Sequence, residues 1–124
     1  MSKWTHIVGA IYLDTFRELN RNDLKEHIEG LVTKAPQITG SEENAMTFVN
    51  VLNGENTYVY ADDYNSVAGF QTCVVITVVG DLRDRDKFET IAETKAFIEY
   101  FRKNLHIMMY SFAIEDDSGY KVQL

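Results

Sequence analysis

Apolar and polar residues alternate along several stretches of this chain, which is the pattern of β-strands that present two different faces. The alternation predicts long strands over residues 4–13, 45–52, 70–82 and 105–115. Asn53 and Gly54 form a strong hairpin signal, so a returning strand is expected over 57–60. A short edge strand is optional over 120–124.

Two other stretches have helical spacing. Residues 22–35 place Leu24, Ile28 and Leu31 on one face, and Pro36 ends the helix because a residue before proline is disfavoured in the α region. A second helix is expected from a capping box that begins at Asp86 to about Lys103. Its predicted apolar stripe consists of Phe88, Ile91, Thr94, Phe97, Ile98 and Phe101.

The resulting order of elements is β-α-β-β-β-α-β in a single domain, residues 1–124. We therefore expect the α+β class: a ferredoxin-like split βαβ sandwich with an antiparallel sheet, two helices on one face and an inserted hairpin strand. A chain of this length with 45% apolar residues can form one core without disulfides or metals.

Three of the predicted strands, 4–13, 70–82 and 105–115, carry apolar residues on both faces. Two helices cover only one face of such a sheet, so the other face would expose a contiguous apolar patch. A second copy packed on that patch predicts a homo-oligomer, either a dimer or a tetramer. The alternative is that residues 53–69 fold over the same face within one chain.

Acidic residues outnumber basic ones by 19 to 12, which gives a formal charge of −7. This charge disfavours long nucleic acids, although a small anion needs only a local basic cluster. An acidic surface can also imitate nucleic acid toward a basic partner protein. Cys73 is the one cysteine, and no apolar run approaches the roughly 18 residues of a membrane span. We therefore expect a cytoplasmic protein without a membrane partner.

No motif indicates catalysis, a metal or a cofactor. The three histidines, His6, His27 and His106, are too scattered to form a metal site and are interpreted as structural or surface residues. Cys73 lies in an apolar strand, where burial makes a thiol unreactive. The carboxylate pairs fall in predicted turns and are interpreted as solvated. The sequence thus predicts a protein that is not an enzyme.

Two loops are candidates for binding an anion. Thr39, Gly40 and Ser41 offer two hydroxyl groups beside a glycine, and such a turn can present N–H groups to phosphate. Arg83 and Arg85 follow the 70–82 strand, and guanidinium groups bind phosphate bidentately. The alternatives remain open: the first loop is also an ordinary helix-to-strand turn, and the alternating Asp and Arg residues can instead form local ion pairs.

Aromatic side chains could complete a nucleotide site, because bases stack on aromatic faces. We name Trp4, Tyr12 and Tyr64 as candidates for stacking on a base. For most aromatic residues of this chain, packing in the core or at an interface is the more common use.

Three segments resemble a group of small phage-encoded proteins, and they occur in the expected order across most of the chain. These segments are residues 1–7 (MSKWTHI), 35–42 (APQITGSE) and 80–85 (GDLRDR). The group is similar to phage sponge proteins that counter CBASS, a bacterial defence with cyclic-nucleotide signals. The resemblance implies an oligomer that binds a cyclic dinucleotide such as 3′3′-cGAMP without cleaving it, with ligand pockets between subunits. The host-cell cytoplasm is then the expected compartment.

The candidate residues named above are chosen for their chemistry and not by matching the family's ligand contacts, and they suit that function. Arg83 and Arg85 could contact phosphate together with residues 39–41, while Trp4, Tyr12 or Tyr64 stacks on a base. Two alternatives remain: an acidic phage inhibitor that blocks a host protein by direct binding, and a small enzyme that cleaves a nucleotide.

Overall fold

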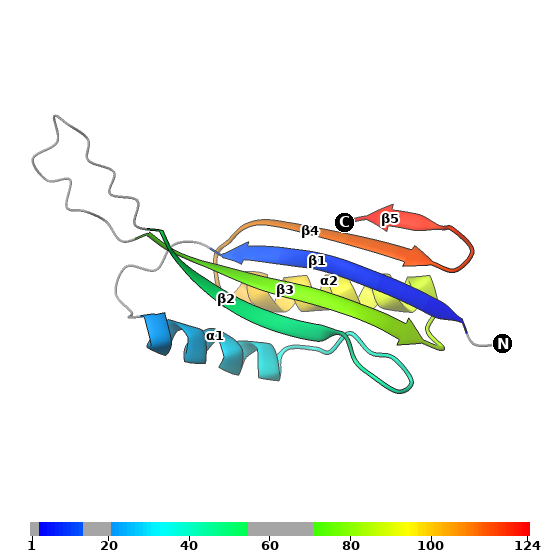
Figure 1. Ribbon diagram of the computed structural model, residues 1–124, viewed down its shortest axis with the longest axis horizontal. Coiled ribbons are helices and arrows are strands. Elements are labelled where there is room, and N and C mark those ends of the chain that lie inside the picture. Colours follow the sequence, from blue (N-terminus) through cyan, green and yellow to red (C-terminus); the bar gives the residue numbers. More distant parts are fainter. Residues whose placement is uncertain (1–2, 14–20, 55–70) are drawn as a thin grey trace, which may run out of the picture.

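The computed structural model describes residues 3–13, 21–54 and 71–124. Within these residues, five strands form one sheet in the order β2-β3-β1-β4-β5, and all neighbouring strands are antiparallel (Figure 1). The strands are β1 (Trp4–Leu13), β2 (Met46–Gly54), β3 (Gln71–Arg83), β4 (Ile107–Asp116) and β5 (Lys121–Gln123). The expected α+β class and antiparallel sheet are confirmed.

The helices are α1 (Arg21–Lys34), which connects β1 to β2, and α2 (Lys87–Asn104), which connects β3 to β4. Both lie on the same face of the sheet (Figure 1). The connected strands β1 and β2 run in the same direction with β3 between them, and β3 and β4 enclose β1 in the same way. The predicted returning strand over 57–60 lies outside the described residues, as does the alternative in which 53–69 covers the sheet.

The core lies between the sheet and the two helices. Alternate residues of β1 and β3 point into it, and Ile11 and Ile76 are fully buried. On β4, Phe112 lies opposite Gly9 of β1, where an added Cβ would meet the Phe112 ring and approach the Ser111 carbonyl oxygen to 2.5 Å. Glycine is therefore needed at position 9 so that the ring can pack over the central strand.

The start of α2 differs from expectation in two details. Asp86 is the N-cap residue, but its side chain makes no capping hydrogen bond, so the predicted capping box is wrong. Phe88 does not belong to the buried stripe and is 61% exposed. The buried face is formed by Thr90, Thr94, Phe97, Ile98 and Phe101. Thr90 in the same first turn is buried, so Phe88 is exposed because it lies on the opposite side of the helix.

The second face of the sheet carries no described helix, and we call its central twelve positions the open face. None of the twelve side chains is charged, and six of the seven large apolar ones are between 43% and 59% exposed, whereas the seventh, Val75, is buried. Successive rows across four strands are Asn50, Val75, Tyr12 and Met109; Phe48, Thr77, Ala10 and Ser111; and Met46, Val79, Val8 and Ala113. The expected apolar second face is therefore present.

The pairing of β1 with β4 contains one irregularity. Tyr12 pairs with Met109, whereas the next residue of β1, Leu13, pairs with Ile107. Met108 is therefore an extra residue, and the strand has a local bulge. Among the described residues, neither helix has the length and apolar character needed to cross a membrane.

Candidate functional site

The predicted anion-binding loops meet at one end of the sheet. The loop after α1 packs against the end of β3, where the Ser41 N–H donates to the Arg83 carbonyl oxygen at 2.9 Å. Gly40 makes this approach possible: an added Cβ would collide with the Glu43 carbonyl and lie 3.3 Å from the Arg83 nitrogen. The close neighbours of Gly40 therefore belong to the chain's own backbone.

Glu93 of α2 holds the same loop from the other side. Its carboxylate accepts hydrogen bonds from the Thr39 backbone N–H at 3.1 Å and from the Thr39 hydroxyl at 2.6 Å. The Ser41 hydroxyl donates to the Asp84 carboxylate at 3.1 Å. Hence the polar groups of Thr39 and Ser41 that were predicted to contact phosphate already have partners inside the chain.

Arg83 and Arg85 extend from a tight turn after β3, in which Asp84 has a positive φ of 57°. Arg83 Nη1 lies 2.6 Å from a carboxylate oxygen of Glu42, and Arg85 Nε lies 3.9 Å from one of Glu89. Arg85 Nε also donates to the Thr39 hydroxyl oxygen at 3.3 Å. Both guanidinium groups therefore have carboxylate neighbours, and an anionic ligand would compete with those ion pairs.

A pocket of about 430 Å³ opens beside this turn. Its walls come from three segments, residues 3–5, 85–87 and 116–118. They bring Trp4 and Arg85 together with two lysines, Lys3 and Lys87. The three cations are matched by three aspartates, so the pocket is electrically balanced in a chain that is strongly acidic.

Lys87 and Asp116 form the best-shielded ion pair near the pocket. Lys87 Nζ lies 3.3 Å from an Asp116 carboxylate oxygen, and these side chains are only 22% and 18% exposed. The lysine also lies 4.2 Å from the centre of the Tyr120 ring, a cation–π contact. Hydrogen bonds from the Ser118 side chain and the Tyr120 backbone, together with Lys87, lower the pKa of Asp116 to about 2.

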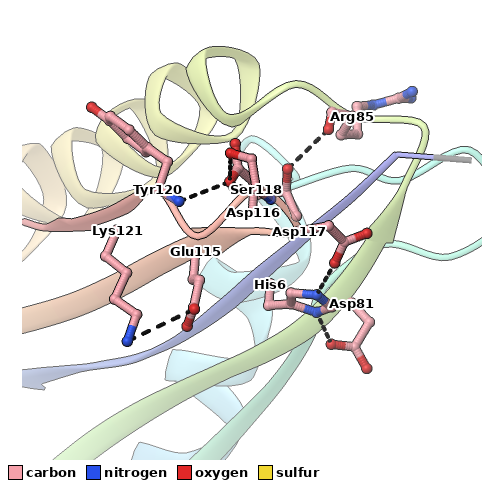
Figure 2. A network of polar contacts seen from close by, with 10 residues as sticks. His6, Asp81, Arg85, Glu115, Asp116, Asp117, Ser118, Tyr120 and Lys121 are labelled. Carbon is pink, nitrogen blue, oxygen red and sulfur yellow. Dashed lines mark hydrogen bonds and ion pairs between the residues drawn. The ribbon is translucent and has the colours of Figure 1, made fainter.

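His6 of β1 links β3 to the turn after β4, next to the pocket. Figure 2 shows its ring between two carboxylates: Nδ1 lies 2.6 Å from Asp81 of β3, and Nε2 lies 3.1 Å from Asp117 after β4. A hydrogen bond to each aspartate, with Asp81 the stronger cause, raises the pKa of His6 above 6.5. A protonated ring can donate to both carboxylates at once.

Most of the predicted site residues lie together at one end of the sheet, but Tyr12 does not. Trp4 pairs with Arg83 in the sheet, and both lie near Arg85 and residues 39–41. Tyr12 lies on the open face eight residues farther along β1, about 26 Å away at 3.3 Å per residue. Tyr64 is outside the described residues. No cluster suited to a metal ion occurs in the described ranges.

Several residues at this end were not singled out from the sequence. Lys3 and Lys87 line the pocket, and Asp117 joins it to His6. The sequence of residues 116–119 is typical of a turn, and aspartates in such turns accept hydrogen bonds through their side-chain oxygens. Asp116 does this, accepting from the Ser118 and Tyr120 backbone N–H groups at 3.0 Å each.

Comparison with known proteins finds no matching family model, no similar curated protein and no similar solved structure. The functional interpretation is therefore built on the residues of the chain and their geometry.

Proposed function

We propose that this chain is a phage anti-defence protein that binds a cyclic nucleotide immune signal, such as 3′3′-cGAMP, and sequesters it without cleavage. In this role it inhibits CBASS-type immunity in the host-cell cytoplasm and acts as a homo-oligomer. The observation that carries the proposal is the pocket in which Trp4, Arg85 and two lysines meet. A cyclic dinucleotide offers the complementary groups, two bases for stacking and two phosphates for the cations.

Each residue has a defined task in this proposal. The Trp4 indole stacks on a base, and Arg85 contacts a phosphate after leaving Glu89, whose Oε2 atom is 3.9 Å from Arg85 Nε. That ion pair is long and its Glu89 side chain is 61% exposed, so its loss costs well under about 1 kcal/mol. Arg83 contributes from the adjoining turn, where its contact with Glu42 is shorter. Sequestration requires no nucleophile, general base or metal.

The fold proposed for this function is the ferredoxin-like one. The order β2-β3-β1-β4, with a helix in each of the two crossovers, supports that assignment. The strand β5 then adds to one edge of the motif. This scaffold places the start of β1 and the end of β3 side by side, which is where the pocket residues meet.

The test is retention of ligand by the purified protein. The full chain is incubated with a panel of cyclic dinucleotides, separated from free ligand, and heat-denatured so that any bound ligand is released for chromatography. Intact ligand is expected, whereas a cleaved product would indicate the nucleotide-cleaving enzyme. Failure to retain any member of the panel would contradict the proposal and favour the acidic inhibitor that binds a host protein.

The matched variants are Arg85→Ala and Arg102→Ala. Arg102 pairs with Glu99 on the exposed side of α2 and lies outside the pocket, so its loss removes an equal charge elsewhere. Arg85→Ala is expected to weaken retention at least tenfold, since charge-assisted contacts to a phosphate contribute about 1.5–3 kcal/mol. Arg83→Ala should weaken it less. Equal retention by the Arg85 and Arg102 variants would rule out the phosphate assignment.

A further inference from the structure

The open face has an electrostatic character unlike the rest of the molecule. One quarter of all residues are charged and the net charge is −7, yet none of the twelve positions in rows from Asn50 to Ala113 carries a charge. Large side chains such as Met46 and Met109 are more than half exposed there. Isolated exposed apolar residues are ordinary, but a contiguous uncharged patch marks an interaction surface.

We propose that a second copy of this chain packs on the open face, sheet against sheet, around a two-fold axis. Two copies that each carry −7 repel one another over most of their surfaces. They approach without like-charge contact where both surfaces are uncharged, and the open face is such a surface. A two-fold interface also places the same patch on both sides, so an uncharged apolar patch is complementary to itself.

The area of the open face determines how strongly we expect the two copies to associate. Four strands about 4.8 Å apart, with three outward residues each at about 6.7 Å intervals, cover roughly 400 Å². A standard interface contributes about 800 Å² from each partner, so this contact belongs to the weak class. We therefore expect a dimer that dissociates in the micromolar range rather than an obligate one.

Charges at one end of the face select the orientation. The row beyond Val8 contains Asp81, His6 and Glu115, two of them acidic. A two-fold axis parallel to the strands would place this row over its own copy and oppose carboxylates. An axis perpendicular to the strands, placed between the Val8 and Ala10 rows, puts it over the neutral row that contains Tyr12 of the partner copy. The second arrangement avoids like-charge contact, so the strands of the two sheets run antiparallel across the interface, apart from sheet twist.

The face-to-face dimer specifies the homo-oligomer included in the proposed function, but it does not depend on ligand binding. The pocket at the start of β1 is lined by residues outside the twelve positions of the open face. Assembly and ligand retention can therefore be measured separately, and either result can fail without the other.

Sedimentation velocity of the full chain at increasing concentration provides the test. We expect a shift from 14.2 kDa toward about 28 kDa, twice the monomer mass, across the micromolar range. Because the interface is uncharged while the copies repel one another, raising the salt concentration should strengthen dimerisation. A species that stays monomeric at about 100 µM overturns the proposal and assigns the face to a different partner.

Two alanine variants provide a matched comparison. Ala113→Glu adds a carboxylate to the open face, and Ala96→Glu adds one on the exposed side of α2, in the opposite layer. Both positions are exposed, so circular dichroism and the melting temperature are expected to stay near those of the unaltered chain. Ala113→Glu should weaken dimerisation at least about tenfold, since each copy then buries an unpaired carboxylate in an apolar contact. Equal weakening by both variants, or by neither, contradicts the proposed interface.

Discussion

We call the end of the sheet that carries Arg83 and Thr39 the polar end. The polar end and the open face differ in whether their exposed groups find partners within the chain. At the polar end, charged groups find partners within the chain, as Arg83 does with Glu42 and Thr39 with Glu93. The open face has no charges, and most of its apolar side chains lie exposed to water. Salt should therefore act in opposite directions, weakening the exposed ion pairs and strengthening contact between two open faces. Hydrogen bonds and ion pairs within the chain hold the residues of a site in place, whereas an exposed apolar surface is stabilised by packing against a partner.

The strongest way to disturb the polar end is to separate its loop from β3. Gly40→Ala places a methyl group against the Glu43 carbonyl and near the Arg83 backbone, atoms that cannot move independently. We expect a loss of about 1–3 kcal/mol in the free energy of unfolding, measured by urea denaturation. Residues 39–41 should also exchange amide hydrogens faster, which separates loop release from a general loss of stability.

Gly30 provides the control for that substitution. It lies inside α1, and nothing lies within 4 Å of the added Cβ position. Gly30→Ala should therefore stabilise the protein by about 0.5–1 kcal/mol, because alanine favours a helix interior. Destabilisation by both substitutions would show that close packing at Gly40 is not the cause.

A smaller effect is expected from the carboxylate that holds Thr39. Glu93→Gln keeps the size of the side chain but replaces a charged acceptor of two hydrogen bonds by a neutral one. The expected loss is about 1–2 kcal/mol in urea denaturation. Glu99→Gln is the control, since its pair with Arg102 is about half exposed and contributes at most about 0.5 kcal/mol. Equal losses of unfolding free energy in the two variants would contradict a stabilising role for the hydrogen bonds between Thr39 and Glu93.

The smallest effect concerns His6, which lies where the two regions meet. Its pKa is raised in the folded protein, so the stability from its protonated form is fully present below pH 6.5 and is lost as the pH rises through the raised pKa. His6→Gln should cost less than about 1 kcal/mol, because both ion pairs are substantially exposed. Melting temperatures should differ between the variant and the unaltered chain near pH 6 and converge near pH 9. A difference that does not vary with pH would contradict this role.

Much of the fold follows from local patterns in the sequence. Strand β1 begins and ends as expected from the alternation of residues 4–13, and β3 is shifted by one residue from the expected 70–82. The second apolar face was also expected, because Cys73, Val75, Thr77 and Val79 share one face of the strand. Phe88 was misassigned because, at 3.6 residues per turn, position 88 lies on nearly the opposite side of the helix from the buried Thr90.

The candidate site was harder to predict because its partners are distant in the sequence. The acidic partners of Arg83 and Thr39 are Glu42 and Glu93, and local spacing does not identify which carboxylates the fold brings near. The same limitation hid the contact between His6 and Asp117, which are 111 positions apart. Arg83 and Arg85 could be grouped from the sequence because they are two positions apart. The sequence did not indicate that Asp84 between them adopts a left-handed conformation, which directs the backbone through a tight turn.

The bulge at Met108 has a consequence for changes in chain length. Side chains of a strand alternate between faces, so a shift of one residue exchanges all of them. Deleting Met108 would bring its neighbours into the uninterrupted register and remove the irregularity beside Tyr12. An insertion or deletion between Met109 and Phe112 would instead rotate Phe112 out of the core and bring Ser111 into it. This segment should therefore accept many substitutions but few changes in length.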